Sequence, residues 1–167
     1  MVVSNESLLS SVVLIDGFFK NNLCHIGFVT KSMSRSLKAW QASDAQIIIP
    51  PTRDPKQNVD CALVAWKSGP PIEIVAPGDA EKPCPIEARL RRGGGLDHLC
   101  YFSDDLIADI ALHKKGGAIL NTTPVYGCVF DRNIAFLTHR TGLVIELMSR
   151  HACGRMPNDP LSRAKWV

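Results

Sequence analysis

The sequence predicts an α+β fold built from two tandem βαβββ modules. The main observation is an internal duplication without gaps, because His98 lies 73 positions after His25 and Glu146 lies 73 positions after Glu73. Both copies contain the same order of short β-favouring runs and one stretch with helical periodicity. With 46% hydrophobic and 21% charged residues, the 167-residue chain has the composition of one well-cored globular domain.

The first copy is expected to form one strand, one helix and three further strands. Prolines and a glycine-containing turn mark where its strands end. Its elements, in order, are a strand at His25–Val29, a helix capped by Ser32 or Ser34 with Met33, Leu37 and Trp40 on its apolar face, a strand at Ile47–Ile49 that stops at Pro50-Pro51, and a hairpin around Ser68-Gly69 whose last strand includes Glu73.

The second copy repeats this order. Its helix is expected to end at Gly116-Gly117, where glycine can adopt a positive φ. Its elements are a strand that includes His98, a helix capped by Ser103 or Asp104 with Leu106, Ile107, Ile110 and Leu112 on its apolar face, a strand at Ala118–Leu120, and a hairpin around Thr141-Gly142 whose last strand includes Glu146.

The repeat also sets the expected domain boundaries. Residues 20–150 form one domain, made of modules at 20–80 and 96–150 joined by a linker at 81–95 with a short helix at Pro85–Arg92. Residues 1–19 are expected to form an N-terminal arm, and the polar residues 151–167 an irregular C-terminal tail.

Charge and cysteine usage exclude several classes of protein. The net charge of +3 is too balanced for a nucleic-acid-binding protein, which typically has a basic stripe. No apolar run approaches the ~20 residues of a membrane span, so no membrane partner is expected. The six cysteines contain no CxxC pair and mostly lie in apolar runs, which favours free thiols, although three disulfides remain formally possible. Without a recognisable secretion signal, we expect a cytoplasmic protein.

The repeated histidines and glutamates are the candidate functional residues. In a strand, alternate side chains point to opposite faces, so His25, Glu73, His98 and Glu146 would all point away from the face that packs on the helices. Two imidazoles and two carboxylates together are suited to Zn, Ni, Co, Mn or Fe(II), with two octahedral positions left open. Taken singly, each residue could instead be a hydrogen-bonded core histidine or an exposed glutamate; its recurrence in both copies favours the metal site.

Several phrases resemble the vicinal oxygen chelate superfamily, in its methylmalonyl-CoA epimerase and glyoxalase I-like branch. They are Gly95-Leu96-Asp97-His98-Leu99-Cys100-Tyr101, Asn133-Ile134-Ala135-Phe136-Leu137, Gly142-Leu143-Val144-Ile145-Glu146-Leu147, and the linker from Pro85-Ile86-Glu87 to Gly95-Leu96. The resemblance covers roughly residues 20–150. It implies two modules that pair their sheets into a U-shaped, partly open mixed sheet around a cleft, with the helices on the outer face.

The resemblance also implies a chemistry. Epimerases of this group hold their metal with His, Gln, His and Glu, whereas bacterial glyoxalase I uses His, Glu, His and Glu, which matches His25, Glu73, His98 and Glu146. One divalent ion (Zn, Ni, Co or Mn) would then stabilise negative charge on a carbonyl or thioester oxygen. Glu146 is the first candidate for the base and Glu73 for the acid on the other side. The expected substrate is a small molecule, such as an acyl-CoA or an α-hydroxythioester.

One departure leaves the reaction open. The epimerases carry a further acid on the strand that corresponds to Val59–Val64, where this chain has Cys61, with Asp60 expected to face away. Two alternatives are therefore retained: an Fe(II) extradiol-type dioxygenase, and a small-molecule-binding resistance-type module without catalysis. A monomer and a homodimer that exchanges modules are both allowed. Secondary candidates are Arg89, Arg91 and Arg92 as phosphate contacts, and Cys100, Phe102 and Met148 as residues lining the cleft.

Overall fold

The computed structural model describes residues 23–161, which contain nine strands and three helices. The first half comprises β1 (Leu23–Val29), α2 (Met33–Gln41), β2 (Gln46–Asp54), β3 (Val59–Ala65) and β4 (Ile72–Pro77). After the short helix α3 (Glu87–Arg91), the second half comprises β5 (Gly95–Ser103), α4 (Leu106–Lys115), β6 (Ile119–Leu120), β7 (Val125–Gly127), β8 (Arg132–Thr138) and β9 (Val144–Ser149).

All nine strands belong to one open, mixed sheet, with the order β2-β3-β4-β1-β5-β9-β8-β6 and with β7 also paired to β8. Within each half the first strand lies parallel to the last, β1 beside β4 and β5 beside β9. The antiparallel pairing of β1 with β5 joins the halves. The predicted α+β class with tandem modules is therefore confirmed. The strand that is continuous as β2 in the first half is divided into β6 and β7 in the second.

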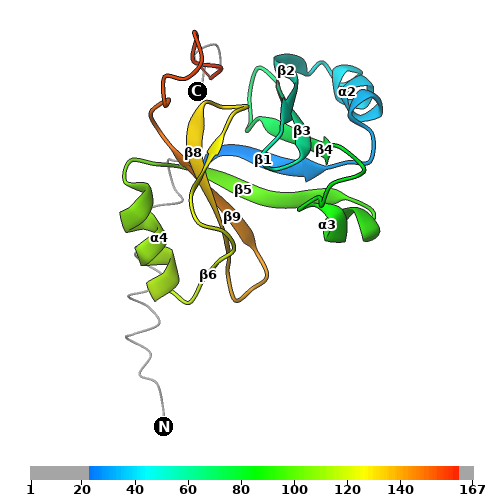
Figure 1. Cartoon of the computed structure of the whole chain (residues 1–167). Helices are drawn as coiled ribbons and strands as arrows, with labels where there is room; N and C mark the ends of the chain where they lie inside the picture. Colours follow the sequence, from blue (N-terminus) through cyan, green and yellow to red (C-terminus); the bar gives the residue numbers. More distant parts are fainter. Residues whose placement is uncertain (1–22, 162–167) are drawn as a thin grey trace.

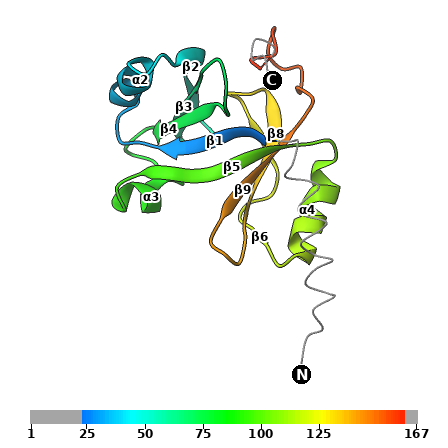
Figure 2. The same cartoon turned by 180° about the vertical axis from the view of Figure 1, so that it is seen from behind.

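The helices cover the outer face of the sheet. Figures 1 and 2 show α2 and α4 at opposite ends of the molecule, each beside its own half. Leu37 of α2 packs on Ile74 of β4, and Ile110 of α4 packs in the same cluster as Leu147 of β9. Because strand side chains alternate, the residues between these apolar positions point to the inner face of the sheet. A third hydrophobic cluster lies on that face.

Two expectations were wrong: the end of the strand at Pro50-Pro51, and the place of Ile107 on the buried face of its helix. β2 does not stop at Pro50-Pro51 but runs through them to Asp54. Proline is tolerated there because β2 is an edge strand. It pairs with β3 on one side only, so a residue without an N–H costs no hydrogen bond on the other side. In α4, Ile107 is 69% exposed, since Leu106, Ile110 and His113, at positions i, i+4 and i+7, form the inward face instead.

The helix caps follow the prediction in the first half only. Ser32 caps α2, because its Oγ accepts a hydrogen bond from Arg35 N. In α4 the cap is Asp105, whose carboxylate accepts from Ala108 N, and neither Ser103 nor Asp104 has this role. Ser103 is the last residue of β5, and its Oγ donates to Asp109 instead.

All six cysteines are free thiols. No helix among residues 23–161 has the length and apolar character needed to cross a bilayer. The predicted N-terminal arm at 1–19 lies outside the described residues, as do residues 162–167 of the tail. The described part of the tail is attached to β8 by Arg132, whose guanidinium forms two 2.8 Å contacts with the Asp159 carboxylate.

His113, buried on α4, contacts His139, which follows β8, and this contact predicts acid sensitivity. His113 Nδ1 lies 3.0 Å from His139 Nε2, and burial together with the nearby His139 lowers the pKa of His113 to about 4. The folded state therefore resists a proton that the unfolded chain accepts below about pH 6.5. We expect this contribution to stability to be complete above pH 6.5 and to be lost as the pH falls toward 4.

Chemical denaturation between pH 7 and 4 tests this expectation. Relative to the variant His113→Gln, the wild-type chain should lose about 1–3 kcal/mol of unfolding free energy over this range. His151→Gln, at an exposed position, should leave the wild-type pH profile unchanged. Parallel profiles for the wild type and His113→Gln would contradict the expectation.

Candidate metal centre

The four repeated residues come together on the inner face of the sheet. His25 lies on β1, Glu73 on β4, His98 on β5 and Glu146 on β9, which are the four central strands. Each residue is at most 5% exposed. One ligand atom from each can be chosen so that all four atoms lie within 4.8 Å of one another. A single chain therefore supplies the whole cluster.

The distances within the cluster suit a shared ion better than direct hydrogen bonds. His25 Nε2 lies 3.1 Å from Glu146 Oε2 and 3.4 Å from Glu73 Oε2, and His98 Nε2 lies 3.3–3.4 Å from the same two oxygens. Even so, His25 Nε2, His98 Nε2 and Glu146 Oε2 have no aligned hydrogen-bond partner among the described residues. Nitrogen and oxygen ligands about 2.0–2.2 Å from one ion would be about 2.9–3.5 Å apart. The donor set therefore fits a divalent ion.

Two shifts in strand register accompany the contacts that prepare the histidines for this role. The pairing of β1 with β5 shifts register between Leu23 and His25, and again between Ile26 and Phe28. At the first shift Cys24 Sγ lies 3.4 Å from His25 Nδ1, and at the second Asp97 Oδ2 lies 3.1 Å from His98 Nδ1. A proton held on each Nδ1 by these partners leaves the Nε2 lone pair for an ion.

Aromatic residues fix the planes of the two imidazoles. The ring of Phe130 stacks on His25, with centroids 5.1 Å apart and an interplanar angle of 17°. The ring of Phe136 meets His98 edge-on, with centroids 5.4 Å apart. Both phenylalanines come from the second half of the sheet, so the second module orients the histidine of the first as well as its own.

The electrostatics of the cluster favour opposite charges on its members. Burial opposes a charged His98, but the carboxylates of Asp97, Glu146 and Glu73 outweigh it and raise the His98 pKa well above its ordinary value. Burial likewise opposes a charged His25, but the nearby Cys24, Glu146 and Glu73 outweigh it and raise the His25 pKa. Conversely, the two imidazoles overcome the effect of burial and lower the pKa of Glu73 and of Glu146. Without an ion, the histidines therefore retain protons above pH 6.5.

A cavity of about 640 Å³ opens onto the cluster. Glu73, His98 and Glu146 contribute to its wall. Most of the remaining lining is apolar, from both halves of the sheet and from the segment before α3: Val59, Val75, Pro83, Pro85, Ile86, Val125, Val129, Phe130, Ile134, Phe136 and Val144. Such a cavity excludes most water from a ligand that reaches the cluster.

The secondary candidates have mixed outcomes. Cys61 lines the cavity, and burial together with the neighbouring Glu73 raises its pKa well above the ordinary value, so it is a neutral thiol. Asp60 points away from the cluster and pairs with Arg53 on the adjacent strand. The prediction that Cys100, Phe102 and Met148 line the cleft was wrong: they are buried in the inner-face cluster but are not among the residues lining the cavity. Of the three linker arginines, Arg91 pairs with Glu87 at the surface.

Sequence reasoning missed the residues that support the histidines. Asp97 could have been found, because it directly precedes His98 as Cys24 precedes His25, at the same 73-residue spacing. Gly27 is a second such residue, since a Cβ built on it would overlap the His98 imidazole ring. The need for a glycine at this position arises from contact between β1 and β5, and no local sequence pattern indicates it.

Gly27→Ala should therefore disturb the cluster without changing either histidine. Because the added methyl displaces the His98 ring, we expect divalent-ion affinity to fall about 10- to 100-fold, as for other changes that misplace a ligand. Titration of the purified protein with Zn²⁺ or Co²⁺ measures this. Gly127→Ala on β7 is the matched control, because its Cβ would meet the end of the Ile134 side chain at 3.1 Å and the Arg132 carbonyl oxygen at 3.6 Å, and no residue of the cluster. Equal affinities for both variants would contradict the assigned role.

The fold and the cluster together define a class of protein, one with paired βαβββ modules around a cavity whose wall carries two histidines and two glutamates. A family model described as the glyoxalase/bleomycin resistance protein/dioxygenase superfamily matches residues 24–136. The chain belongs to this superfamily.

Solved structures show the same fold. A hypothetical protein of Bacillus halodurans C-125 has 25% identity and a TM-score of 0.68, over 79% of this chain and 96% of that one. Methylmalonyl-CoA epimerase from Mycobacterium tuberculosis has 22% identity and a TM-score of 0.67, over 79% and 89%. A Streptomyces coelicolor methylmalonyl-CoA epimerase variant in complex with 2-nitronate-propionyl-CoA has 20% identity and a TM-score of 0.64, over 78% and 98%. No curated protein sequence matches the chain.

Proposed function

We propose that the chain is a metal-dependent isomerase or lyase that moves a proton on a carbon next to a carbonyl or thioester. The observation that carries this proposal is the convergence of two imidazoles and two carboxylates on one buried point beside an apolar cavity. Membership of the superfamily supports it, as does the likeness in fold to epimerases whose structures contain CoA thioesters. On the same grounds we propose a small-molecule substrate of the acyl-CoA or α-hydroxythioester class.

The four clustered residues would hold one divalent ion, with Zn, Ni, Co and Mn all compatible with nitrogen and oxygen ligands. When bound, this ion supplies Lewis-acid stabilisation of the negative charge that develops on the substrate oxygen. The Nε2 atoms of His25 and His98 are oriented for it by Cys24 and Asp97. The apolar lining keeps water from competing for the reacting proton.

Two carboxylates are available to move the proton. Glu146 Oε2 is buried, has no hydrogen-bond partner among the described residues and lies in the cavity wall, so it is the proposed base. Glu73 reaches the same cavity from the other half of the sheet and is the proposed partner that returns the proton. The Cys61 thiol also lines the cavity, and its raised pKa makes it a poor base at neutral pH.

Deuterium exchange tests the proposal directly. Metal-loaded protein in D₂O should incorporate deuterium at C2 of methylmalonyl-CoA or of an α-hydroxythioester, detected by mass spectrometry. Glu146→Gln should slow exchange about 100- to 10,000-fold while its metal content is measured alongside. Binding of both compounds without exchange would favour the non-catalytic binding module. Oxygen consumption that requires Fe(II) and a catechol would favour the dioxygenase, and either outcome would reject the proposal.

A further inference from the structure

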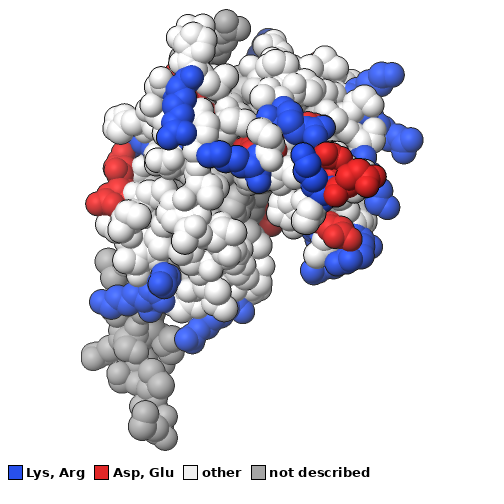
Figure 3. Space-filling view, viewed as in Figure 1, with Lys and Arg blue, Asp and Glu red and all other residues white. Residues whose placement is uncertain are grey.

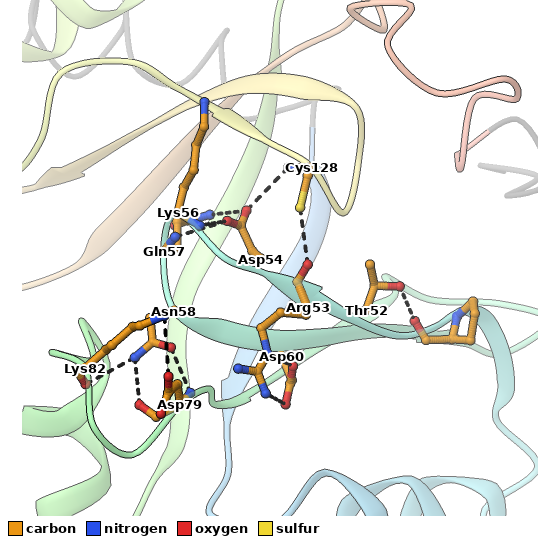
Figure 4. Close-up of polar contacts among 11 residues, drawn as sticks. Thr52, Arg53, Asp54, Lys56, Gln57, Asn58, Asp60, Asp79, Lys82 and Cys128 are labelled. Carbon is orange, nitrogen blue, oxygen red and sulfur yellow. Dashed lines mark hydrogen bonds and ion pairs between the residues drawn. The ribbon is translucent and has the colours of Figure 1, made fainter.

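The rim of the cavity carries one unpaired cation. Lys56, in the turn between β2 and β3, is the only lysine or arginine among the described residues that line the cavity. Its ammonium forms no ion pair with a described carboxylate, and in Figure 4 its Nζ stands away from every dashed contact. Elsewhere on the face shown in Figure 3, basic side chains are dispersed, with acidic groups among them, and they form no continuous stripe. Lys56 is thus distinguished by its position on the cavity rim.

The backbone beneath Lys56 is firmly held. The Asp54 carboxylate accepts hydrogen bonds from the backbone N–H of Lys56, at 2.9 Å, and of Gln57, at 3.0 Å. It also accepts from Cys128 N at 3.3 Å, which ties this turn to the segment that follows β7 (Figure 4). Asp54 therefore fixes the start of the Lys56 side chain, and its own acceptors are occupied by backbone N–H groups.

A second cation, Arg155, contacts the same aromatic ring as Lys56, although it does not itself line the cavity. Lys56 Nζ is 5.7 Å from the ring centroid of Tyr126, and Arg155 Cζ is 4.4 Å from the same centroid. The nearby Asp131 carboxylate is occupied, since it accepts from Tyr126 Oη at 2.8 Å and from the backbone N–H of Arg155. Among the described residues, the side-chain partner that the structure gives the Lys56 ammonium and the Arg155 guanidinium is the Tyr126 ring, a weaker partner than an anion that accepts charge-assisted hydrogen bonds.

We propose that Lys56, assisted by Arg155, binds an anionic group of the substrate, a carboxylate or a phosphate, at the mouth of the cavity. This rests on the proposed function in one respect, namely that the substrate occupies this cavity. A ligand in this cavity can place its reacting carbonyl beside Glu73, His98 and Glu146 and an anion beside Lys56, because all four residues line the same cavity. Lys56 is then a specificity-determining residue, which selects anionic over neutral thioesters.

Four ligands test the proposal and separate the two sources of the anion. Methylmalonyl-CoA has both a substrate carboxylate and nucleotide phosphates, and propionyl-CoA has only the phosphates. The methylmalonyl thioester of N-acetylcysteamine has only the carboxylate, and the propionyl thioester of N-acetylcysteamine has neither. Titration calorimetry with metal-loaded protein gives each dissociation constant without requiring turnover.

Lys56→Met should weaken binding about tenfold for the ligands that carry the recognised anion, and should leave the neutral thioester unaffected. Lys56→Arg should restore binding, and Arg155→Met should cause a smaller loss. Lys67→Met, at an exposed position in the hairpin turn between β3 and β4, is the matched control and should change nothing. Weaker binding of the methylmalonyl thioester of N-acetylcysteamine would identify a carboxylate as the recognised anion. Weaker binding of propionyl-CoA would identify a phosphate.

Three results would overturn the proposal: no binding of any of the four ligands by the wild-type protein, an equal loss for all four in Lys56→Met, or no loss for any. Its outcome is distinct from that of the proposed function. Lys56-dependent binding without deuterium exchange supports the anion site and rejects the reaction. Deuterium exchange by the wild-type protein, together with unchanged ligand affinity in Lys56→Met, supports the reaction and rejects the anion site.

Discussion

We expect His98→Ala to lose most of the protein's affinity for a divalent ion while the fold is retained. The reason is geometric, since His98 Nε2 lies 3.3–3.4 Å from the carboxylate oxygens of both Glu73 and Glu146, and no other described imidazole can replace it. We expect affinity for Zn²⁺ or Co²⁺ to fall about 100-fold or more, because an ion held by three ligands loses both a bond and the geometry of the site. Metal analysis after dialysis, with circular dichroism to follow folding, measures the change.

Matched variants make this result specific. His25→Ala should have an effect of similar size, because the duplication makes His25 and His98 equivalent in position. Glu146→Ala should also weaken binding, since Glu146 Oε2 lies 3.1 Å from His25 Nε2 and 3.4 Å from His98 Nε2. His151→Ala, at an exposed position outside the cluster, should retain full metal content. If His98→Ala cannot be purified, His98→Asn preserves a polar side chain and provides the same comparison. Wild-type metal content in folded His98→Ala would contradict the account.

Metal uptake should release protons and become tighter as the pH rises. Without metal, Cys24, Glu146 and Glu73 raise the pKa of His25 well above 6.5. The carboxylates of Asp97, Glu146 and Glu73 do the same for His98, so both imidazoles hold protons at neutral pH. A bound ion needs the Nε2 lone pairs and must displace these protons. Apparent affinity should therefore rise about tenfold per pH unit for one displaced proton, and about 100-fold for two.

Calorimetric titrations in buffers of different ionisation enthalpy count the protons released. We expect between one and two per ion for the wild type and about one fewer for any residual binding by His98→Ala. The same raised pKa values affect stability without metal. The protonated histidines stabilise the metal-free fold below about pH 6.5, and this contribution is lost as the pH rises through their folded-state pKa. Affinity independent of pH between 6 and 8 would contradict this account.

The sequence was sufficient to predict the four cluster residues because two simple regularities determine their placement. Alternation along a strand sets the face on which His25 or Glu73 lies, and the constant spacing of the duplication brings the second pair to the equivalent place. The class of fold followed from the same repeat. Neither regularity depends on details of packing, so both could be recognised without a structure.

The support of the cluster depends on contacts that no local pattern encodes. The register shifts at which Cys24 and Asp97 contact the histidines arise from how β1 pairs with β5 across the two modules. The stacking of Phe130 on His25 joins residues that are far apart in the chain. Likewise, the exposure of Ile107 depends on which turn of α4 meets the sheet, and the hydrophobic pattern alone allowed another choice.

X-ray absorption spectroscopy of the protein loaded with one equivalent of Zn²⁺ tests the central claim most directly. If both imidazoles and both acidic side chains bind the ion, the first shell contains only nitrogen and oxygen at about 2.0–2.2 Å, with imidazole scattering from two histidines. Sulfur at about 2.3 Å would instead place the ion at the neighbouring group of Cys24, His25 and Cys100, and would contradict the account.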